Sequence, residues 1–293
     1  MNKTYLIAGA TGYLGKHLVK AANAAGHRVH AVARSPENVP DCADEVIVAE
    51  ATNAESLVGI CDGVDVVVSS LGITRQRDGL SYEDVDYAAN KNILHEAIRA
   101  GVGRFGYVHV LNAEQMLNVP MVRAKARFAE ELKEAAIDST LICPSGFFSD
   151  IEEVLEMARR GRVYLFGDGS TRVSPIDGRD MAAVCISAVD AGQSELDIGG
   201  PETLSFQEIA ELAFEVLGKS ARVTHIPHRV GTLGVGAAKL LGFGKSVGPF
   251  EFFIAASALD MSARHHGSIR LREHFQRLEG TAIPSEEKEV LSV

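Results

Sequence analysis

Tyr5-Leu6-Ile7-Ala8-Gly9-Ala10-Thr11-Gly12-Tyr13-Leu14-Gly15 is an apolar run that leads directly into three glycines spaced three residues apart. The helical stretch Lys16-His17-Leu18-Val19-Lys20 follows at once. Such a turn lets backbone amides approach a pyrophosphate, and the helix N-terminus adds about half a positive charge there. A glycine-rich turn can also serve strand–helix packing alone. Because strand, turn and helix all agree here, the stretch predicts a bound dinucleotide.

The end of the second expected strand, residues 28–33, bears on the kind of dinucleotide. Arg34 and Ser35 follow this strand, at a position where NAD sites usually carry Asp or Glu. A carboxylate there accepts hydrogen bonds from the ribose but repels a 2′-phosphate, whereas a guanidinium pairs with the phosphate or stacks on the adenine. The sequence therefore predicts NADP(H) as the cofactor. The alternative is a solvated arginine at a strand end.

Strand and helix patterns continue to alternate as far as residue 148. Further strands are expected at 46–49, 64–69, 105–111 and 139–143, and helices at 53–61, 82–100 and 121–136. Nearly continuous apolar strands separated by amphipathic helices require a parallel sheet covered on both faces. Right-handed crossovers make this a doubly wound α/β fold of the Rossmann type, with ligand at the carboxyl edge of the strands.

Several segments are expected at this edge and are assigned to the cofactor site. The predicted cofactor-binding residues are Gly9, Thr11, Gly12, Tyr13, Leu14, Gly15, Arg34, Ser35, Ala51, Thr52, Ser70, Leu71, Gly72, Lys125, Pro144, Ser145 and Phe147.

The pattern after Phe148 is mixed and predicts a smaller α/β lobe over residues 149–293 that encloses a substrate. Residues 174–202 are expected to return to the first domain, residues 1–148. Within the lobe, Asp180 is expected to cap a helix that runs through Val189, and Ser205 and Glu208 form a capping box.

Composition excludes several functional classes. A formal charge of −10 argues against nucleic acid, because a phosphate-tracking surface needs a basic excess. No signal peptide is expected before the first strand. The 4 cysteines lie apart in the sequence and are expected to be free thiols in a reducing compartment, which favours the cytoplasm. We expect no metal, because Pro227 interrupts the helix that would set the spacing of His225 and His228.

The segment 230–259 is unusually apolar, but glycine and lysine interrupt it too often for a helix that spans a membrane. It predicts a pair of helices that form a hydrophobic lid or a contact surface. An interfacial membrane helix is the alternative. A protein partner or a membrane surface is therefore expected at this segment, and the sequence indicates no oligomeric interface.

Several motifs together resemble a known family. They are Gly9 to Gly15, Arg34, Val85-Asp86-Tyr87-Ala88-Ala89-Asn90-Lys91-Asn92, Met121-Val122-Arg123-Ala124-Lys125, Cys143 to Phe148, and Ser174-Pro175-Ile176-Asp177-Gly178-Arg179-Asp180. As a set they are similar to the atypical, extended short-chain dehydrogenase/reductases, and in particular to the NAD(P)H-binding, NmrA-like group. The resemblance covers about the first 215 residues and implies a nucleotide-binding oxidoreductase fold.

The resemblance also implies an active site, from which this chain departs. The family commonly places a serine at the end of the fifth strand and Tyr-x-x-x-Lys on the next helix, where the tyrosine moves a proton and the lysine holds the nicotinamide ribose. Here Lys125 is kept, His109 stands at the serine position and Met121 at the tyrosine position. Methionine cannot shuttle a proton. Lys125 and His109 therefore remain as the catalytic candidates, and a buried structural histidine is the alternative for His109.

Two functions fit this departure. The first is an NADP(H)-dependent oxidoreductase that acts on a hydrophobic small molecule, such as an activated double bond, with the proton supplied by Lys125, His109, the substrate or water. The second is a cofactor-binding protein without turnover: a redox sensor, a regulator or an assembly factor that acts through a partner. Tyr87 and Asn90 are further candidates for the same cleft, with helix packing as their alternative role.

Overall fold

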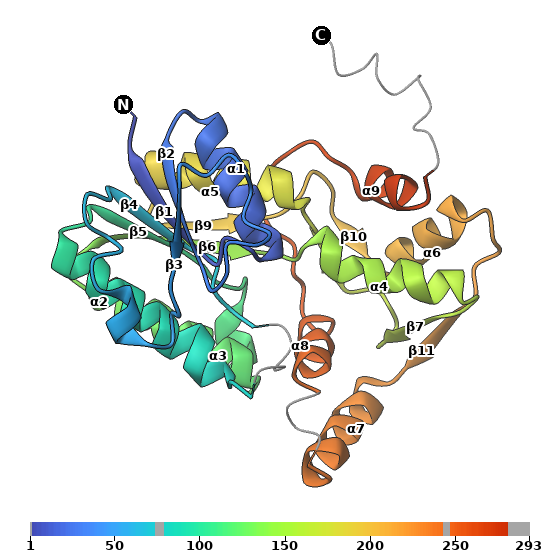
Figure 1. Ribbon diagram of the computed structural model, residues 1–293. Helices are drawn as coiled ribbons and strands as arrows, with labels where there is room; N and C mark the ends of the chain where they lie inside the picture. The colour runs from blue at the N-terminus through green and yellow to red at the C-terminus, as the bar shows by residue number, and fades with distance from the viewer. Residues whose placement is uncertain (1, 74–78, 243–246, 281–293) are drawn as a thin grey trace.

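A seven-stranded parallel sheet lies at the centre of the molecule (Figure 1), in a computed structural model that describes residues 2–73, 79–242 and 247–280. The strand order is β3-β2-β1-β4-β5-β6-β9. The strands are β1 (Thr4–Ala8), β2 (Arg28–Ala33), β3 (Glu45–Val48), β4 (Val66–Ser69), β5 (Arg104–Val108), β6 (Asp138–Pro144) and β9 (Glu195–Ile198). The order reverses between β1 and β4, which confirms the doubly wound fold predicted from the sequence.

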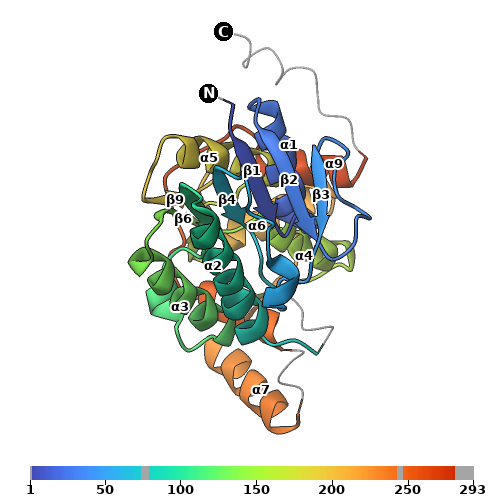
Figure 2. The same ribbon diagram turned by 60° about the vertical axis from the view of Figure 1, so that its left-hand side comes forward.

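Helices cover both faces of the sheet (Figures 1 and 2). α1 (Tyr13–Ala24) and α5 (Gly178–Asp190) pack together on one face, and α2 (Asn90–Ala100) and α3 (Pro120–Glu134) lie on the other. Successive residues of a strand point to opposite faces, so Leu6 enters the core beneath α2 and α3 while Ile7 enters the core beneath α1 and α5. Both faces of the central sheet are buried beneath helices, which explains why the strands are apolar along their whole length.

A second hydrophobic core belongs to the smaller lobe. Its elements are α4 (Phe148–Arg159), β7 (Val163–Phe166), β8 (Arg172–Val173), β10 (Leu204–Ser205), α6 (Phe206–Val216), β11 (Val223–Ile226), α7 (His228–Leu240), α8 (Gly248–Ala256) and α9 (Leu271–Leu278). β7 pairs with β11 and β8 with β10. α5 and β9 come from the chain after Phe148 but pack on the central sheet, where β9 pairs with β6.

Three elements differ from the sequence-based expectation. The expected helix over 82–100 opens as a π-helical turn, η2 (Glu83–Ala89), before α2 begins. The fifth strand ends at Val108, so His109 follows it rather than lying within it. The expected helix over 53–61 is the short 3-10 helix η1 (Ala54–Leu57).

The expected cap of α5 was also misplaced, whereas the capping box of α6 is confirmed. Asp177, not Asp180, caps α5, because its side chain accepts a hydrogen bond from the amide of Arg179. Asp180 lies in the first turn and instead accepts hydrogen bonds from the amides of Ser268 and Ile269, at 2.7 and 2.9 Å. At α6, the side chains of Ser205 and Glu208 each bond to the other's backbone.

Candidate cofactor and active site

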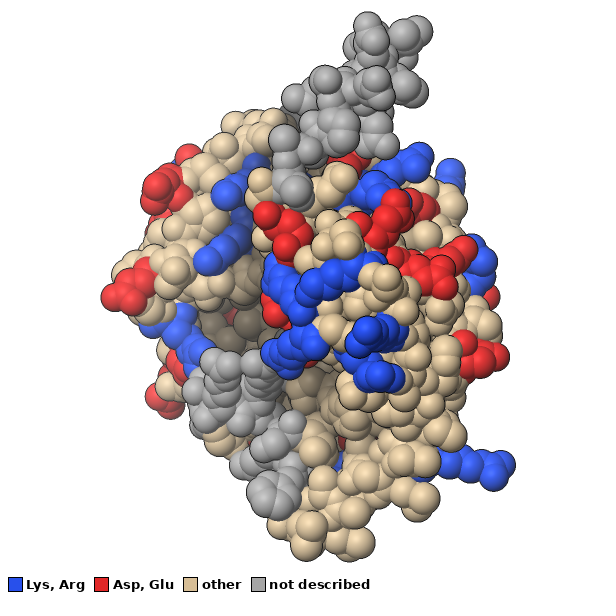
Figure 3. Space-filling view, turned by 90° about the vertical axis from the view of Figure 1, so that its right-hand side faces the viewer, with Lys and Arg blue, Asp and Glu red and all other residues tan. Residues whose placement is uncertain are grey.

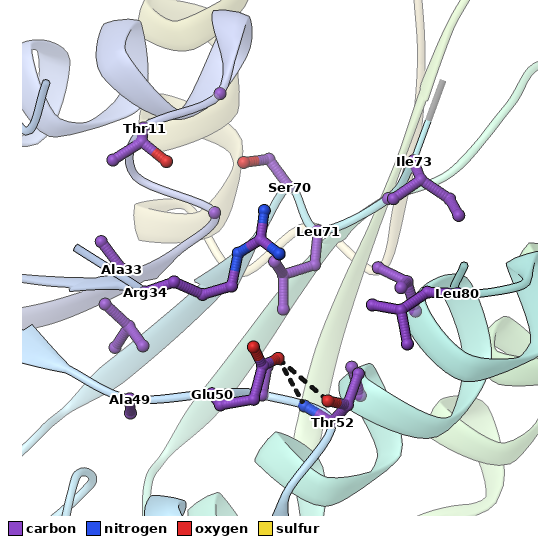
Figure 4. A pocket seen from close by; sticks show the side chains of 17 residues that line it. Thr11, Ala33, Arg34, Ala49, Glu50, Thr52, Ser70, Leu71, Ile73 and Leu80 are labelled. Carbon is purple, nitrogen blue, oxygen red and sulfur yellow. Dashed lines mark hydrogen bonds between the residues drawn. The ribbon is translucent and has the colours of Figure 1, made fainter. Parts of the chain in front are cut away.

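A cavity of about 250 Å³ opens at the carboxyl ends of β1 to β4 (Figure 4). The structure brings together nine of the predicted cofactor residues in its lining: Gly9, Thr11, Gly12, Arg34, Ala51, Thr52, Ser70, Leu71 and Gly72. It adds eight that the sequence did not indicate: Val32, Ala33, Ala49, Glu50, Ile73, Leu80, Val85 and Ala89. The cavity lies at the point where the strand order reverses, which is where doubly wound folds bind their ligands.

The turn between β1 and α1 presents backbone to this cavity. Gly9 has a φ of +81°, a conformation that glycine adopts without strain, and the amide of Gly12 donates to the carbonyl of Gly9 at 2.9 Å. A Cβ on Gly15 would overlap that same carbonyl, so Gly15 serves close packing of α1 on the turn. Gly12 begins α1 without a side-chain cap, and the first turn carries no acidic residue. The N-terminal amides of α1 are therefore available to an anion.

Two charged side chains of opposite sign face the cavity next to the turn. Figure 4 shows Arg34 reaching in from the end of β2, with Glu50 below it on the segment that also carries Thr52. A Glu50 carboxylate oxygen accepts hydrogen bonds from the amide and the hydroxyl of Thr52, at 3.3 and 2.9 Å. Sugar hydroxyls donate to a carboxylate so placed, and a phosphate pairs with a guanidinium. Glu50 directly follows the end of the third expected strand, a position that could have suggested it.

Behind Gly72 lies a pair of oppositely charged side chains, Asp86 and Lys125. Asp86 is fully buried, and its Oδ1 is 3.5 Å from Lys125 Nζ. Lys125 also donates to the carbonyl of Val108 at 3.2 Å and lies over the Tyr107 ring. A Cβ added to Gly72 would lie 2.7 Å from Asp86 Oδ1 and 3.2 Å from Lys125 Nζ. The absence of a side chain at Gly72 therefore leaves the charge pair directly against the cavity wall.

Burial and pairing act in opposite directions on Asp86. Burial raises the pKa of its carboxyl group, while the Lys125 ammonium and the amide of Ile73 favour the ionised form. The backbone amide of Ile73 donates to the second carboxylate oxygen at 3.2 Å. Lys125 is thus the polar group that offsets the cost of placing Asp86 in the interior.

Asn90 holds Asp86 in place rather than facing the cleft. The Ser69 hydroxyl donates to the side-chain oxygen of Asn90 at 2.5 Å. The side-chain amide of Asn90 donates to the backbone carbonyls of Val85 and Asp86, at 3.2 and 3.0 Å. The end of β4 is thereby tied to the π-helical turn. Tyr87, the other candidate on this helix, instead donates to Glu131 at 2.7 Å.

His109 is less suited to acid catalysis than its ordinary chemistry suggested. Burial, with a contribution from Lys125, lowers the pKa of its imidazole to about 3, so the ring is neutral at physiological pH. Its Nδ1 is buried and makes no hydrogen bond to the described residues. His109 does not line the cavity. The neutral, buried ring favours the alternative of a structural histidine, and a role for His109 as the acid stays a prediction.

The other predicted cofactor residues lie outside the cavity lining. Tyr13 accepts a hydrogen bond from the amide of Gly178 at 3.2 Å, Ser145 accepts one from the amide of Ser174 at 3.0 Å, and Ser35 accepts one from the amide of Glu37 at 3.3 Å. Leu14 is buried in the core beneath α1, Gly15 packs against Gly9, Pro144 ends β6, and Phe147 lies edge-on to Tyr13. Most of these residues connect the sheet to α1, α5 or the lobe.

Within residues 2–73, 79–242 and 247–280, no group of three or more His, Cys, Asp or Glu side chains could hold a metal ion.

The sequence matches a known family. A family model described as NAD(P)H-binding matches residues 9–191. The chain belongs to this family of atypical short-chain dehydrogenase/reductases. Its membership confirms the resemblance that the motifs indicated.

Curated relatives of this chain differ in what their names describe. The chain is 31% identical over 251 residues to divinyl chlorophyllide a 8-vinyl-reductase of Zea mays, with 78% of this chain and 62% of the relative covered. It is 24% identical over 230 residues to the photosystem II assembly factor Ycf39 of Guillardia theta, with 76% and 73% covered. The chain thus matches less than two thirds of the length of the plant reductase.

A solved structure shares the overall fold. The NADPH-dependent quinone oxidoreductase QOR2 of Escherichia coli, solved with NADPH, matches with a TM-score of 0.76 at 16% identity, and 94% of this chain and 99% of that chain are covered. The family, the cavity and the fold together make this chain an NAD(P)H-binding protein of an oxidoreductase-like family.

Proposed function

We propose that this protein is an NADP(H)-dependent reductase of a hydrophobic small molecule. The observation that carries the proposal is the Asp86–Lys125 pair, which lies against the wall of the nucleotide cavity at Gly72. Burial of a charge pair costs desolvation energy, so its position against the nucleotide cavity supports a role for Lys125 at the cofactor. An ammonium held beside the cofactor can bind the ribose and supply a proton.

The cofactor would be held mainly by backbone and by Arg34. The amides at the start of α1 suit the pyrophosphate, and Arg34 suits a 2′-phosphate. When bound, the reduced nicotinamide supplies a hydride. Lys125 would orient the ribose and donate the proton that the reduced substrate requires, while Asp86 would hold the Lys125 side chain in position.

The apolar character of the substrate is supported by Met121. This residue packs against both the core beneath α2 and α3 and the core of the lobe. It therefore lies at the junction between the two parts of the molecule, with a thioether where the family commonly has a phenol. Phe252 and Phe253 of α8 also pack on the lobe core, and α8 packs against α3. These side chains favour an apolar acceptor over a sugar or another polar substrate.

A non-catalytic role is the second candidate, and Met121 together with the neutral His109 favours it, since neither supplies a proton. One matched relative is named an assembly factor and another a reductase. In this role the protein would bind NADP(H) and act through a partner.

A reducing compartment such as the cytoplasm is part of the proposal. It is supported by the cysteines, all 4 of which are free thiols. Burial raises the pKa of Cys61 and Cys143 to about 12, so neither forms a thiolate readily.

The proposal is tested by calorimetry with NADPH and NADH, followed by NADPH oxidation with a panel of apolar enones and quinones. Arg34→Asp is expected to weaken NADPH binding by about 1–3 kcal/mol, the scale of a charge-assisted hydrogen bond, and to affect NADH much less. Arg28→Asp, at the exposed opposite end of β2, is the matched control and should change neither. Equal affinity of the wild type for the two nucleotides would refute the cofactor choice. Tight NADPH binding without turnover of any acceptor would favour the second candidate.

A further inference from the structure

α7 carries its apolar side chains on the side that faces away from the protein. Val230, Leu233, Leu240 and Leu241 are 56%, 73%, 91% and 74% exposed. Their spacing of three, seven and one residues, bridged by the exposed Ala237, places them on one face of the helix. An ordinary surface helix has the opposite arrangement, with this stripe turned toward the core.

The inward face of α7 is already occupied. Val235 is buried in a small cluster with Phe166 and Ile254, and a Cβ on Gly231 would contact both of those side chains. α7 is therefore seated on β7 and α8 through a narrow line of small residues. Its exposed leucines cannot turn inward without loss of this contact, so the outward stripe is a fixed feature of the fold.

α7 lies at one end of the molecule, so this apolar stripe is accessible from outside. The helix projects beyond the rest of the chain (Figures 1 and 2), and in Figure 3 the lower end of the molecule, where α7 lies, is almost entirely without charged side chains. Large exposed apolar patches on soluble proteins mark interaction sites.

The charge around α7 differs in sign from that of the whole protein. The chain carries 39 acidic residues and a net charge of −10, but the sequence from Pro227 to Phe250 contains no Asp or Glu. Arg229 is exposed and lies four residues before Leu233, on the same side of the helix. Lys239, at the other end, is paired with Glu251 at 2.6 Å. The exposed apolar stripe therefore lies next to the positive charge of Arg229, in a segment of sequence without acidic residues.

We propose that α7 docks on the surface of an anionic lipid bilayer, with Val230, Leu233, Leu240 and Leu241 in the boundary between headgroups and acyl chains. Exposed aliphatic side chains on a convex helix suit acyl chains, and Arg229 suits a lipid phosphate. The acidic body is a smaller obstacle because α7 projects and charge repulsion is screened over about 10 Å at 0.1 M salt.

The helix would lie on the bilayer rather than cross it. α7 has 13 residues, about 20 Å of helix, whereas the hydrocarbon core is about 30 Å thick. Among the helices of residues 2–73, 79–242 and 247–280, none has the length and apolar content needed for a membrane span.

The test is flotation of the full chain with phosphatidylcholine vesicles that contain about one third phosphatidylglycerol, compared with phosphatidylcholine alone; the composition follows from the need for anionic lipid. We expect the wild type to float with the anionic vesicles and much less with the neutral ones. Leu233→Ser/Leu240→Ser should reduce the bound fraction at least about tenfold, because two large aliphatic side chains would no longer enter the bilayer. Arg229→Gln should weaken binding to anionic vesicles only.

Val58→Ser is the matched control, since Val58 is 73% exposed, like Leu233, but lies far from α7 in the sequence. Thermal melting verifies that each variant is folded. No flotation of the wild type, or equal flotation of the leucine variant and the wild type, overturns the proposal. A concentration-dependent dimer in light scattering that Leu233→Ser/Leu240→Ser abolishes also overturns it, in favour of an interface between two copies. None of these results depends on NADP(H) binding or turnover.

Discussion

The two ends of the ligand cavity are built in different ways. At the turn after β1, the polar groups that face the cavity are backbone amides, and the residues that shape the turn are glycines. At the Gly72 wall, the polar groups are the side chains of Asp86 and Lys125, which reach the wall from η2 and α3. One end is made by a local stretch of chain, and the other by two helices that pack together.

This difference determines what each end tolerates. A turn made of backbone excludes side chains but needs no particular charge. A buried charge pair depends on the balance between burial and attraction. Substitutions at the glycine turn and at the charge pair should therefore impair different properties of the protein.

The largest effect is expected at the turn. Gly12→Val should abolish NAD(P)H binding, because the branched side chain would occupy the space of the pyrophosphate. The fold should survive, since a Cβ on Gly12 meets only the carbonyl of Gly9, at 3.2 Å. Calorimetry with NADPH and a melting curve measure both. Gly234→Ala, on α7, where an added Cβ meets nothing within 4 Å, is the control and should leave NADPH binding unchanged and the protein folded. A folded Gly12→Val variant with unchanged affinity would show that the turn does not hold the pyrophosphate.

The next effect is expected at the charge pair. If hydride transfer occurs, Lys125→Met should reduce kcat by about 100- to 10,000-fold, the usual contribution of a proton-transfer group. Arg123→Met, an exposed position on the same helix, should leave it unchanged. Nucleotide binding should weaken much less than in Gly12→Val, because the backbone turn remains. If Lys125→Met and Gly12→Val lost NADPH affinity equally, the glycine turn would not be the main site of nucleotide binding.

The smallest effect concerns the pH dependence of stability near the charge pair. The pKa of His109 is lowered from 6.5 to about 3, so the folded protein binds fewer protons than the unfolded chain between these values. Stability from the neutral ring is complete above pH 6.5 and is lost as the pH falls toward 3. At pH 5 the loss is roughly 2 kcal/mol.

His109→Gln should remove this loss when denaturant unfolding is compared at pH 7 and pH 5. His95→Gln, an exposed histidine on α2, should not. An identical pH dependence in the wild type and His109→Gln would mean that the ring is not buried as described.

The turn could be predicted from the sequence because strand, glycines and helix are contiguous. Glu50 was not predicted, because the cofactor residues expected after the third strand began at Ala51, one residue later. Asp86 could not be assigned, since its partner Lys125 lies on another helix and no local pattern brings them together. The neutral state of His109 depends on burial, which the sequence does not report.

Ser145 and Phe147 differ from the nine predicted residues that line the cavity. They follow a strand of the sheet and are expected to face the ligand, because ligands of such sheets bind at the carboxyl ends of the strands. In the structure, Ser145 accepts a hydrogen bond from Ser174, and Phe147 pairs with Ile176. The connection to the lobe occupies the edge at this strand, and that connection has no motif of its own.

The pairing of β9 with β6 has a consequence for synthesis on the ribosome. β6 is complete at Pro144, but its partner strand ends at Ile198, after α4, β7, β8 and α5 have been made. Until then β6 is an unpaired edge strand, and α5 has not covered its face of the sheet. Unpaired edges of this kind recruit other strands. A chain stopped near residue 148 should therefore aggregate, and one stopped after Ile198 should be the shortest fragment with all seven strands of the sheet.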